Sequence, residues 1–329
     1  MPHTMCKTNK EVHLLSDYIL RTNNLSKKYK HDFAIQNINV TIKKGEIYGF
    51  IGQNGAGKST MLRLVTGLTF PTSGSIELFQ SDNVKDFTDA QKRMGAIIEN
   101  PALFLHMTAY ENLEVHRLQK GIPGKDCIEQ TLELVGLSDT GKKKTKNFSL
   151  GMKQRLGIAI ALLSDPEFII LDEPTNGLDP IGIVELRELI KKLNREKGLT
   201  VLISSHILSE LHQLATKFGI IHKGKLLEEL SSKELDEKCR RHLQIKVDDS
   251  PKGATVLERN LFTTDFEVME DGMIKLYSHF EDVRKVSRAL TNNGLVIEHL
   301  SQRGDSLESY FSKLVGGAEH EESYEGRSI

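Results

Sequence analysis

The chain has 329 residues, of which 38% are hydrophobic and 27% charged, the composition of a globular protein with a sizeable core. Its 44 Lys and Arg residues against 45 Asp and Glu residues give a net charge of −1, which predicts no general attraction to nucleic acid or anionic lipid. Three widely spaced cysteines argue against a disulfide scaffold or zinc cluster, and no apolar run approaches the ~18 residues of a membrane span.

An N-terminal extension, residues 1–17, lacks the apolar core of a signal peptide, so we expect a soluble protein that stays where it is made. After it, short apolar strands and amphipathic helices alternate, with a helical insert at about 100–165. This rhythm predicts a wound α/β sheet within residues 18–235. The predicted strands are 18–25, 33–42, 46–51, 75–79, 94–98, 168–171, 200–204 and 218–221, and the predicted helices include 58–66, 182–196 and 207–215.

A smaller α+β domain is predicted for residues 236–316, after a charged helical stretch at 233–241. Its elements follow the order β-α-β-β-α-β, with an acidic hairpin turn at 270–272, which suggests a ferredoxin-like fold. The strands are expected at 242–247, 266–269, 273–277 and 296–300, and the helices at 254–260, 281–292 and 307–315. The Gly-, Glu- and Ser-rich tail, residues 317–329, is expected to be disordered.

A glycine-rich loop, Gly52–Thr60, carries the clearest chemical signal. It fits Gly-x-x-x-x-Gly-Lys-[Ser/Thr] between a predicted strand and a predicted helix, the context of a loop that cradles the phosphates of a nucleoside triphosphate. Lys58 would reach the β- and γ-phosphates, and the Ser59 hydroxyl would ligate Mg²⁺. The residues that we expect at the nucleotide are Gly52, Asn54, Gly55, Gly57, Lys58, Ser59 and Thr60.

Two carboxylates, Asp172 and Glu173, end the apolar stretch 168–171. Such a pair, taken alone, is often no more than a polar end to a strand. Downstream of a phosphate loop, the first acid is expected to hold Mg²⁺ and the second to orient or deprotonate the attacking water.

The sequence Ser149-Leu150-Gly151-Met152-Lys153-Gln154 precedes a predicted helix. Together with the phosphate loop and the acid pair, it resembles the signature loop Leu-Ser-Gly-Gly-Gln of ABC-transporter ATPase subunits, with methionine in place of the second glycine. The resemblance spans about residues 18–230 and implies a phosphate-loop ATPase domain that includes an antiparallel β subdomain. It also implies that Ser149, Gly151 and Gln154 contact the γ-phosphate of ATP bound to a second copy, although Ser149 is equally suited to cap the helix.

Three further positions follow the same family pattern. Asp179 lies in a segment that resembles the D-loop, which communicates across the dimer. His206 resembles the switch histidine that contacts the γ-phosphate, although a lone histidine at a strand end is more often structural. Tyr29 matches the aromatic residue that stacks on adenine.

One position departs from the family. Glu99 stands where a glutamine generally reaches Mg²⁺ and the attacking water, so it is a candidate metal ligand and catalytic residue, and its extra negative charge would alter metal affinity or the timing of hydrolysis. Glu99, Met152-Lys153 and the segment 179–182 most resemble the bacitracin-export and lantibiotic-immunity branch. That branch pairs a single ATPase chain with a separate membrane subunit.

The resemblance therefore implies an ATP- and Mg²⁺-dependent exporter subunit that acts as a homodimer, with each ATP held between two copies. It also implies a separate integral membrane permease that keeps the protein at the cytoplasmic face of the membrane, and cargo of the peptide-antibiotic type. A soluble ABC ATPase acting on ribosomes or DNA is the alternative, but those proteins usually carry two ATPase units or long coiled-coil inserts. The basic run 142–146 could touch RNA, although such runs are usually solvated loops, so no nucleic acid partner is expected. An importer, or a sodium or general drug-efflux ATPase, also stays open.

Overall fold

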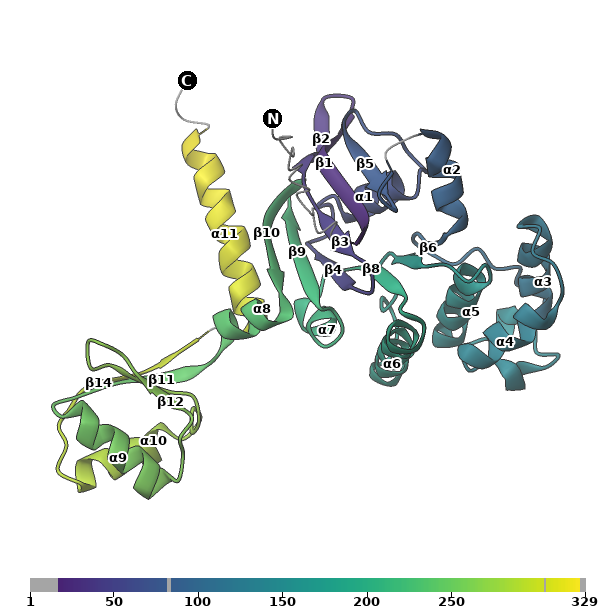
Figure 1. Ribbon diagram of the computed structural model, residues 1–329. Helices are drawn as coiled ribbons and strands as arrows, with labels where there is room; N and C mark the ends of the chain where they lie inside the picture. The colour runs from purple at the N-terminus through teal and green to yellow at the C-terminus, as the bar shows by residue number, and fades with distance from the viewer. Residues whose placement is uncertain (1–16, 82–83, 305, 326–329) are drawn as a thin grey trace, which may run out of the picture. The chain divides into compact units, whose positions relative to one another are not determined.

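The computed structural model describes residues 17–81, 84–304 and 306–325, with only the backbone described at 84–86 and 318–325 (Figure 1). The predicted extension therefore lies almost entirely outside the described residues. The chain forms two compact units. Unit 1 comprises the described part of Met1–His206 together with Leu214–Leu226, and unit 2 comprises Ile207–Gln213 and the described part of Leu227–Ile329. The sequence had placed the boundary later, at residue 235.

Five parallel strands form the centre of unit 1, and in the complete sheet order, β10-β9-β4-β8-β7-β6, the outer strand β10 runs from unit 1 into unit 2. Strands β4 and β7 are apolar at almost every position and buried throughout, as expected for parallel strands covered on both faces. The strands are β4 (Ile47–Ile51), β6 (Met94–Ile97), β7 (Phe168–Leu171), β8 (Thr200–Ser205), β9 (Lys217–His222) and β10 (Lys225–Ser231). The sequence did not predict β10, because its three leucines and three charged residues do not alternate and most of its positions are half-exposed.

A second sheet of unit 1 is antiparallel, with β1 (Tyr18–Tyr29) paired to β2 (Asp32–Ile38), β3 (Thr41–Lys43) and β5 (Ser73–Leu78). The single strand expected at 33–42 is therefore two strands. Between them, the Val40 N–H donates to the Thr22 hydroxyl, which itself donates to the Ile38 carbonyl oxygen. A buried side chain thus satisfies the backbone where the ladder is interrupted.

Some helices of unit 1 begin at side-chain caps. Thr108 and Glu111 form a reciprocal capping box at α3, and Asp179 caps α6 by accepting from the Gly182 N–H. Helices α3, α4 and α5 form the predicted insert between β6 and β7 (Figure 1). The helices are α1 (Lys58–Val65), α2 (Val84–Lys92), α3 (Ala109–Gln119), α4 (Asp126–Leu134), α5 (Leu150–Leu162) and α6 (Pro180–Lys197), with 3₁₀ helices at Ser138–Thr140 and Thr145–Asn147.

Most of unit 2 is a four-stranded antiparallel sheet in the order β12-β13-β11-β14, with α9 and α10 in the connections. This reproduces the β-α-β-β-α-β order predicted from the sequence. Alternate residues of β11 are buried, because they face the core shared with the two helices. The elements are β11 (His242–Val247), α9 (Ser250–Leu261), β12 (Phe266–Val268), β13 (Ile274–Leu276), α10 (Val283–Asn292) and β14 (Ile297–Arg303).

Three more helices complete unit 2: α7 (Leu208–His212), α8 (Ser232–Cys239) and α11 (Leu307–Glu325). The disorder expected from residue 317 is not observed over 317–325, where α11 continues through a run rich in helix-forming Glu. Residues 326–329 lie outside the described part of the chain. Glu228 accepts hydrogen bonds from Lys238 of α8 and Tyr310 of α11, so it links both helices to β10.

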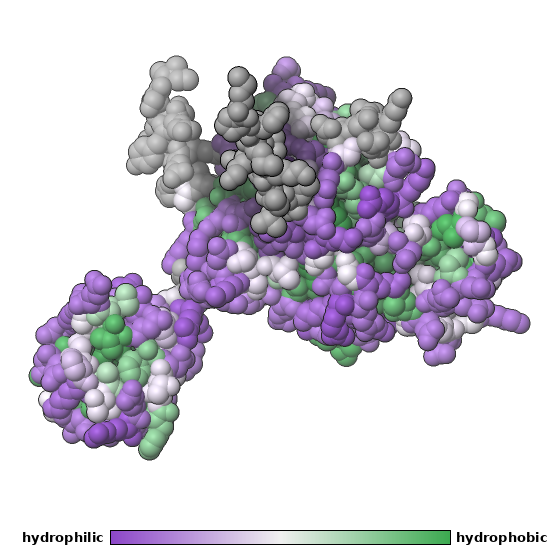
Figure 2. Space-filling view, viewed as in Figure 1, coloured by the Kyte–Doolittle hydropathy of each residue, from purple (hydrophilic) through white to green (hydrophobic). Residues whose placement is uncertain are grey.

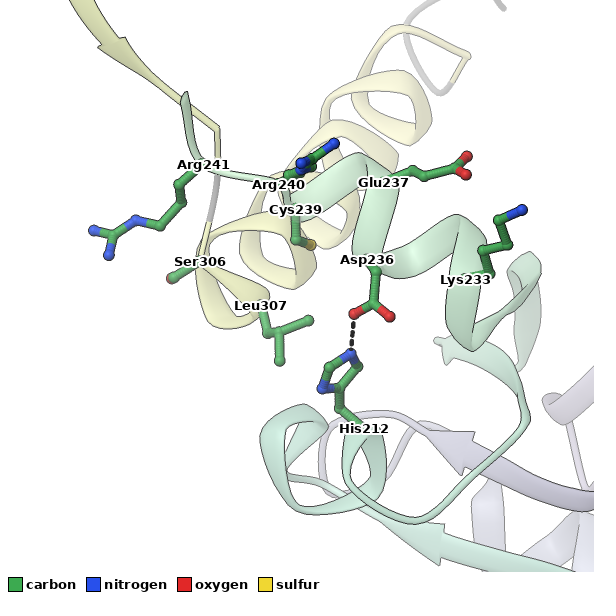
Figure 3. A pocket seen from close by; sticks show the side chains of 9 residues that line it. All are labelled: His212, Lys233, Asp236, Glu237, Cys239, Arg240, Arg241, Ser306 and Leu307. Carbon is green, nitrogen blue, oxygen red and sulfur yellow. Dashed lines mark hydrogen bonds and ion pairs between the residues drawn. The ribbon is translucent and has the colours of Figure 1, made fainter. Parts of the chain in front are cut away.

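Unit 2 also contains a cavity of about 600 Å³ (Figure 3). Across it, His212 Nε2 and Asp236 Oδ1 lie 2.5 Å apart. Arg240 and Arg241 line the cavity but pair with Asp265 and Glu281. The cavity therefore offers few uncommitted charges for an ionic ligand.

Among the described residues on the face shown in Figure 2, hydrophilic residues predominate and hydrophobic residues occur in separate patches. Among the described residues, no helix combines the length and the hydrophobicity that are needed to span a membrane.

Candidate functional site

The predicted phosphate loop lies between β4 and α1, and its glycines are required by close backbone contacts. A Cβ atom at Gly52 would lie 2.5 Å from the Ile221 carbonyl oxygen, and one at Gly57 would lie 2.5 Å from the Ala34 carbonyl oxygen. Gly57 also has φ +110° and precedes α1 without a side-chain cap. The first N–H groups of α1 are therefore left for an anion, which the positive end of the helix dipole favours.

A cavity of about 180 Å³ brings most of the predicted phosphate-binding residues together with one of the two strand-end acids. Ala34 of β2 closes one side of it, a residue that the sequence analysis missed because alanine carries no chemical signal. The lining residues are Ala34, Asn54, Gly55, Gly57, Lys58, Ser59, Thr60 and Glu173. The larger cavity of unit 2 contains none of them.

Lys58, Glu173 and His206 form a connected polar chain at this cavity. Lys58 Nζ lies 3.0 Å from Glu173 Oε1, and His206 Nδ1 lies 2.6 Å from Glu173 Oε2. The Lys58 side chain is only 5% exposed and also donates to the carbonyl oxygens of Gly52 and Gln53. The lysine predicted to bind phosphate thus directly contacts the acid predicted to activate water.

The charge state of Glu173 follows from these contacts. Burial raises the pKa of its carboxyl group, but the hydrogen bonds from Lys58 and His206 outweigh this effect and hold the pKa below its ordinary value. Glu173 is therefore ionised at neutral pH, as a general base must be.

Asp172 is held in a separate set of contacts. Its side chain is 4% exposed, and its Oδ1 accepts a hydrogen bond of 2.6 Å from the Ser204 hydroxyl. The same hydroxyl accepts from the Glu173 N–H at 2.9 Å. The sequence analysis did not single out Ser204, and its place at the end of the predicted strand 200–204, close to His206, was the available signal.

Glu99 lies at the carboxyl end of β6, next to β7, with φ +63°. Its carboxylate pairs with Arg63 of α1, and 62% of the side chain is exposed. The sequence analysis did not anticipate Arg63, which balances the negative charge that Glu99 introduces. The catalytic and metal-binding roles assigned to Glu99 remain predictions.

The residues at the cavity suit Mg²⁺ only together with a nucleotide. No group of three or more His, Cys, Asp or Glu side chains in the described ranges could hold a metal ion. Ser59 lines the cavity and would supply a hydroxyl, whereas Asp172 is buried outside the lining and would supply a carboxylate. Mg²⁺ is commonly bound by one or two carboxylates plus substrate phosphates. The donor set therefore fits Mg²⁺ that arrives with ATP.

A second group of predicted residues lies at the N-termini of α5 and α6 and does not line the cavity. Ser149 is exposed and caps α5 by accepting from the Met152 N–H. Its neighbour Gly151 approaches the segment that ends at Asp179: a Cβ there would lie 3.9 Å from Leu178 Cδ2. Gln154, by contrast, is buried, and its Oε1 lacks a hydrogen-bond partner in the described part of the chain.

Tyr29 ends β1 opposite Asp32 and does not line the cavity. Its side chain is 47% exposed, and Lys27 Nζ lies 5.1 Å from the ring centroid. A half-exposed ring can stack on a planar ligand. The contact of Tyr29 with adenine remains a prediction.

Gly57→Ala tests the close approach at the loop. We expect the free energy of unfolding to fall by about 3 kcal/mol, because the new Cβ would meet the Ala34 carbonyl oxygen in a backbone region unfavourable to alanine. Gly45→Ala is the control, since Gly45 has φ +78° but open space around its Cβ, and about 1 kcal/mol is expected there. Urea denaturation compares the two variants. Equal losses would show that the contact is unimportant.

The chain is similar to known proteins of one family. A family model described as ABC transporter matches residues 35–176. The bacitracin transport ATP-binding protein BcrA of Bacillus licheniformis is 46% identical over 299 residues, covering 91% of this chain and 98% of the relative. The lantibiotic transport ATP-binding protein SrtF of Streptococcus pyogenes is 47% identical over 212 residues, covering 64% and 90%. The dimeric, post-hydrolysis structure of the ATP-binding cassette MJ0796 with ADP and Pi matches at a TM-score of 0.58 and 27% identity, covering 65% of this chain and 99% of that one.

Proposed function

The chain belongs to the ABC transporter family and is one of its ATPases, and we propose that it powers a separate membrane permease that exports peptide antibiotics of the bacitracin and lantibiotic kind. The observation that carries the ATPase role is the cavity in which the phosphate loop meets Glu173. The cargo is inferred from relatives whose names place them in bacitracin and lantibiotic transport.

The site residues divide the work of hydrolysis. The loop N–H groups, the α1 N-terminus and Lys58 bind the phosphates of ATP. Ser59 and Asp172 would hold Mg²⁺, which neutralises charge on the transferring phosphoryl group. Glu173 orients and deprotonates the attacking water, and His206, 2.6 Å from it, holds that carboxylate in place.

ATP binding supplies Lys58 with a new partner. In this structure the Lys58 ammonium group pairs with Glu173. A phosphate that binds this ammonium group would replace Glu173 as its partner, and the carboxylate would then be available to the attacking water. Binding of substrate therefore prepares the base.

The residues at the N-termini of α5 and α6 would act in ATP binding through a second copy of the chain. Ser149 and Asp179 lie at helix N-termini away from the cavity, so a head-to-tail dimer would present the α5 N-terminus of one copy to the ATP of the other. The dimeric cassette MJ0796 supports this arrangement. Attachment to the permease would then keep the protein at the cytoplasmic face of the membrane.

Deletion of the gene tests the cargo. The deletion strain, complemented with the wild type, Lys58→Ala or Lys44→Ala, is challenged with bacitracin, lantibiotics and unrelated antibiotics. We expect resistance to the peptide antibiotics to need the wild type or Lys44→Ala, because Lys44 is a surface residue paired with Glu167. Unchanged sensitivity across the panel would remove this cargo.

Co-purification tests the partner. Tagged Glu173→Gln protein is isolated in mild detergent with ATP from its own cells and analysed by mass spectrometry. A polytopic membrane protein in near-equal amount is expected. Ribosomal proteins or nucleic acid without a membrane protein would contradict the exporter proposal.

A further inference from the structure

The Ser204 hydroxyl lies fully buried between the two strand-end acids. Ser204 follows the residue of β8 that pairs with Leu171 in the parallel register, so it stands beside the point where β7 ends and the acid pair begins. Its Oγ donates to Asp172 Oδ1 at 2.6 Å and accepts from the Glu173 N–H at 2.9 Å. One hydroxyl thus contacts the side chain of one acid and the backbone of the next.

The backbone of Glu173 needs such support. Its φ of +45° lies in the left-handed region, which costs a non-glycine residue energy unless the surroundings hold it there. This turn of the backbone separates the two carboxylates: Asp172 points to Ser204, whereas Glu173 points to Lys58 and His206.

Serine suits this position for a specific reason. A hydroxyl is both a donor and an acceptor, and the fully buried Ser204 hydroxyl does both here. Alanine would leave the buried Asp172 carboxylate short of a donor and the Glu173 N–H without its acceptor. Each loss would lower the free energy of unfolding, because an unpaired polar group in a buried site is unfavourable.

We infer that Ser204 is a positioning residue for ATP hydrolysis: it fixes the orientation of the Asp172 carboxylate and the backbone of Glu173, and so sets the two acids in their separate roles. The inference rests on the ATPase role stated above. Ser204 does not line the phosphate cavity, so its effect falls on the acids and not on the bound phosphates.

We expect Ser204→Ala to change kcat strongly and the Kd of ATP only slightly. Ser204→Ala should lower kcat by about 10- to 100-fold, the usual cost of losing a group that orients catalytic ligands. The Kd of ATP measured in EDTA should change less than about threefold, because the phosphate loop and Lys58 are untouched. The additional affinity that Mg²⁺ confers on ATP, a binding readout independent of turnover, should decrease.

The experiment compares Ser204→Ala with Thr200→Ala. Thr200 is equally buried on the same strand, and its hydroxyl also accepts a backbone N–H, that of Gly45, at the opposite end of β8. Tm, nucleotide Kd with and without Mg²⁺, KM and kcat are measured for both. We expect both variants to lose stability and only Ser204→Ala to lose turnover. Ser204→Cys retains a weak donor and acceptor, should recover part of kcat, and provides the comparison if Ser204→Ala does not fold.

A double variant shows whether Ser204 acts through Glu173. In the Glu173→Gln background, Ser204→Ala should lower the residual turnover by a smaller factor than in the wild type, because only the contribution through Asp172 is left to lose. A kcat loss no greater than that of Thr200→Ala, or a full additional loss in the Glu173→Gln background, would overturn the inference. A wild-type protein that does not hydrolyse Mg-ATP would instead refute the proposed function.

Discussion

Glu173→Gln is expected to remove nearly all ATP hydrolysis while leaving ATP bound between two copies. Glutamine keeps the shape of the side chain but cannot accept the proton of the attacking water, so kcat should fall by about 10²- to 10⁴-fold. The substitution also removes the negative charge that pairs with Lys58 at 3.0 Å, which leaves the ammonium group available to phosphate. ATP affinity should therefore be maintained or increased.

The oligomeric state provides the second measurement. Size-exclusion chromatography with light scattering should show a dimer of Glu173→Gln with saturating Mg-ATP and a monomer without nucleotide. Glu196→Gln is the control, because Glu196 is exposed and pairs only with its neighbour Arg195 among the ion pairs described. A Glu173→Gln protein that stays monomeric with Mg-ATP would contradict the ATP-sandwich dimer.

Lys58→Ala is expected to abolish measurable ATP binding. Two charge-assisted hydrogen bonds to phosphate are worth about 1.5–3 kcal/mol each, so their loss corresponds to at least a ~100-fold weaker affinity. The fold should survive with a lower Tm: the substitution removes the desolvation cost of a buried cation, but it also leaves Glu173 without its Lys58 partner. Isothermal titration calorimetry with ATP, alongside Tm, separates the two effects.

Lys44→Ala is the matched control for this loss of charge. Lys44 pairs with Glu167 at 3.2 Å on the surface of unit 1 and lies outside the cavity lining. Its replacement should leave ATP affinity within about twofold, since surface ion pairs contribute little. If Lys58→Ala bound ATP as tightly as Lys44→Ala, the assignment of the cavity to phosphate would be wrong.

The family and the main fold class were predicted from the sequence and confirmed by the comparisons. In the second domain, the order of the strands and helices could be predicted from the sequence, but the position of the domain boundary could not. Alternation along β11 and the turn at 270–272 are local signals, but β10 is half-exposed and carries none. The predicted break at residue 235 lies inside the longer of the two segments of unit 2, Leu227–Ile329.

The sequence by itself determined the phosphate loop, because positive φ at glycine and a free helix N-terminus depend on a few consecutive residues. It likewise determined the buried strands and the cap at Ser149. The tertiary structure decided which side chains meet: Lys58 with Glu173, Glu99 with Arg63, and Ser204 with both acids. These contacts depend on the order in which parallel strands lie side by side, since their carboxyl ends share one edge of the sheet, and no local pattern in the chain encodes that order.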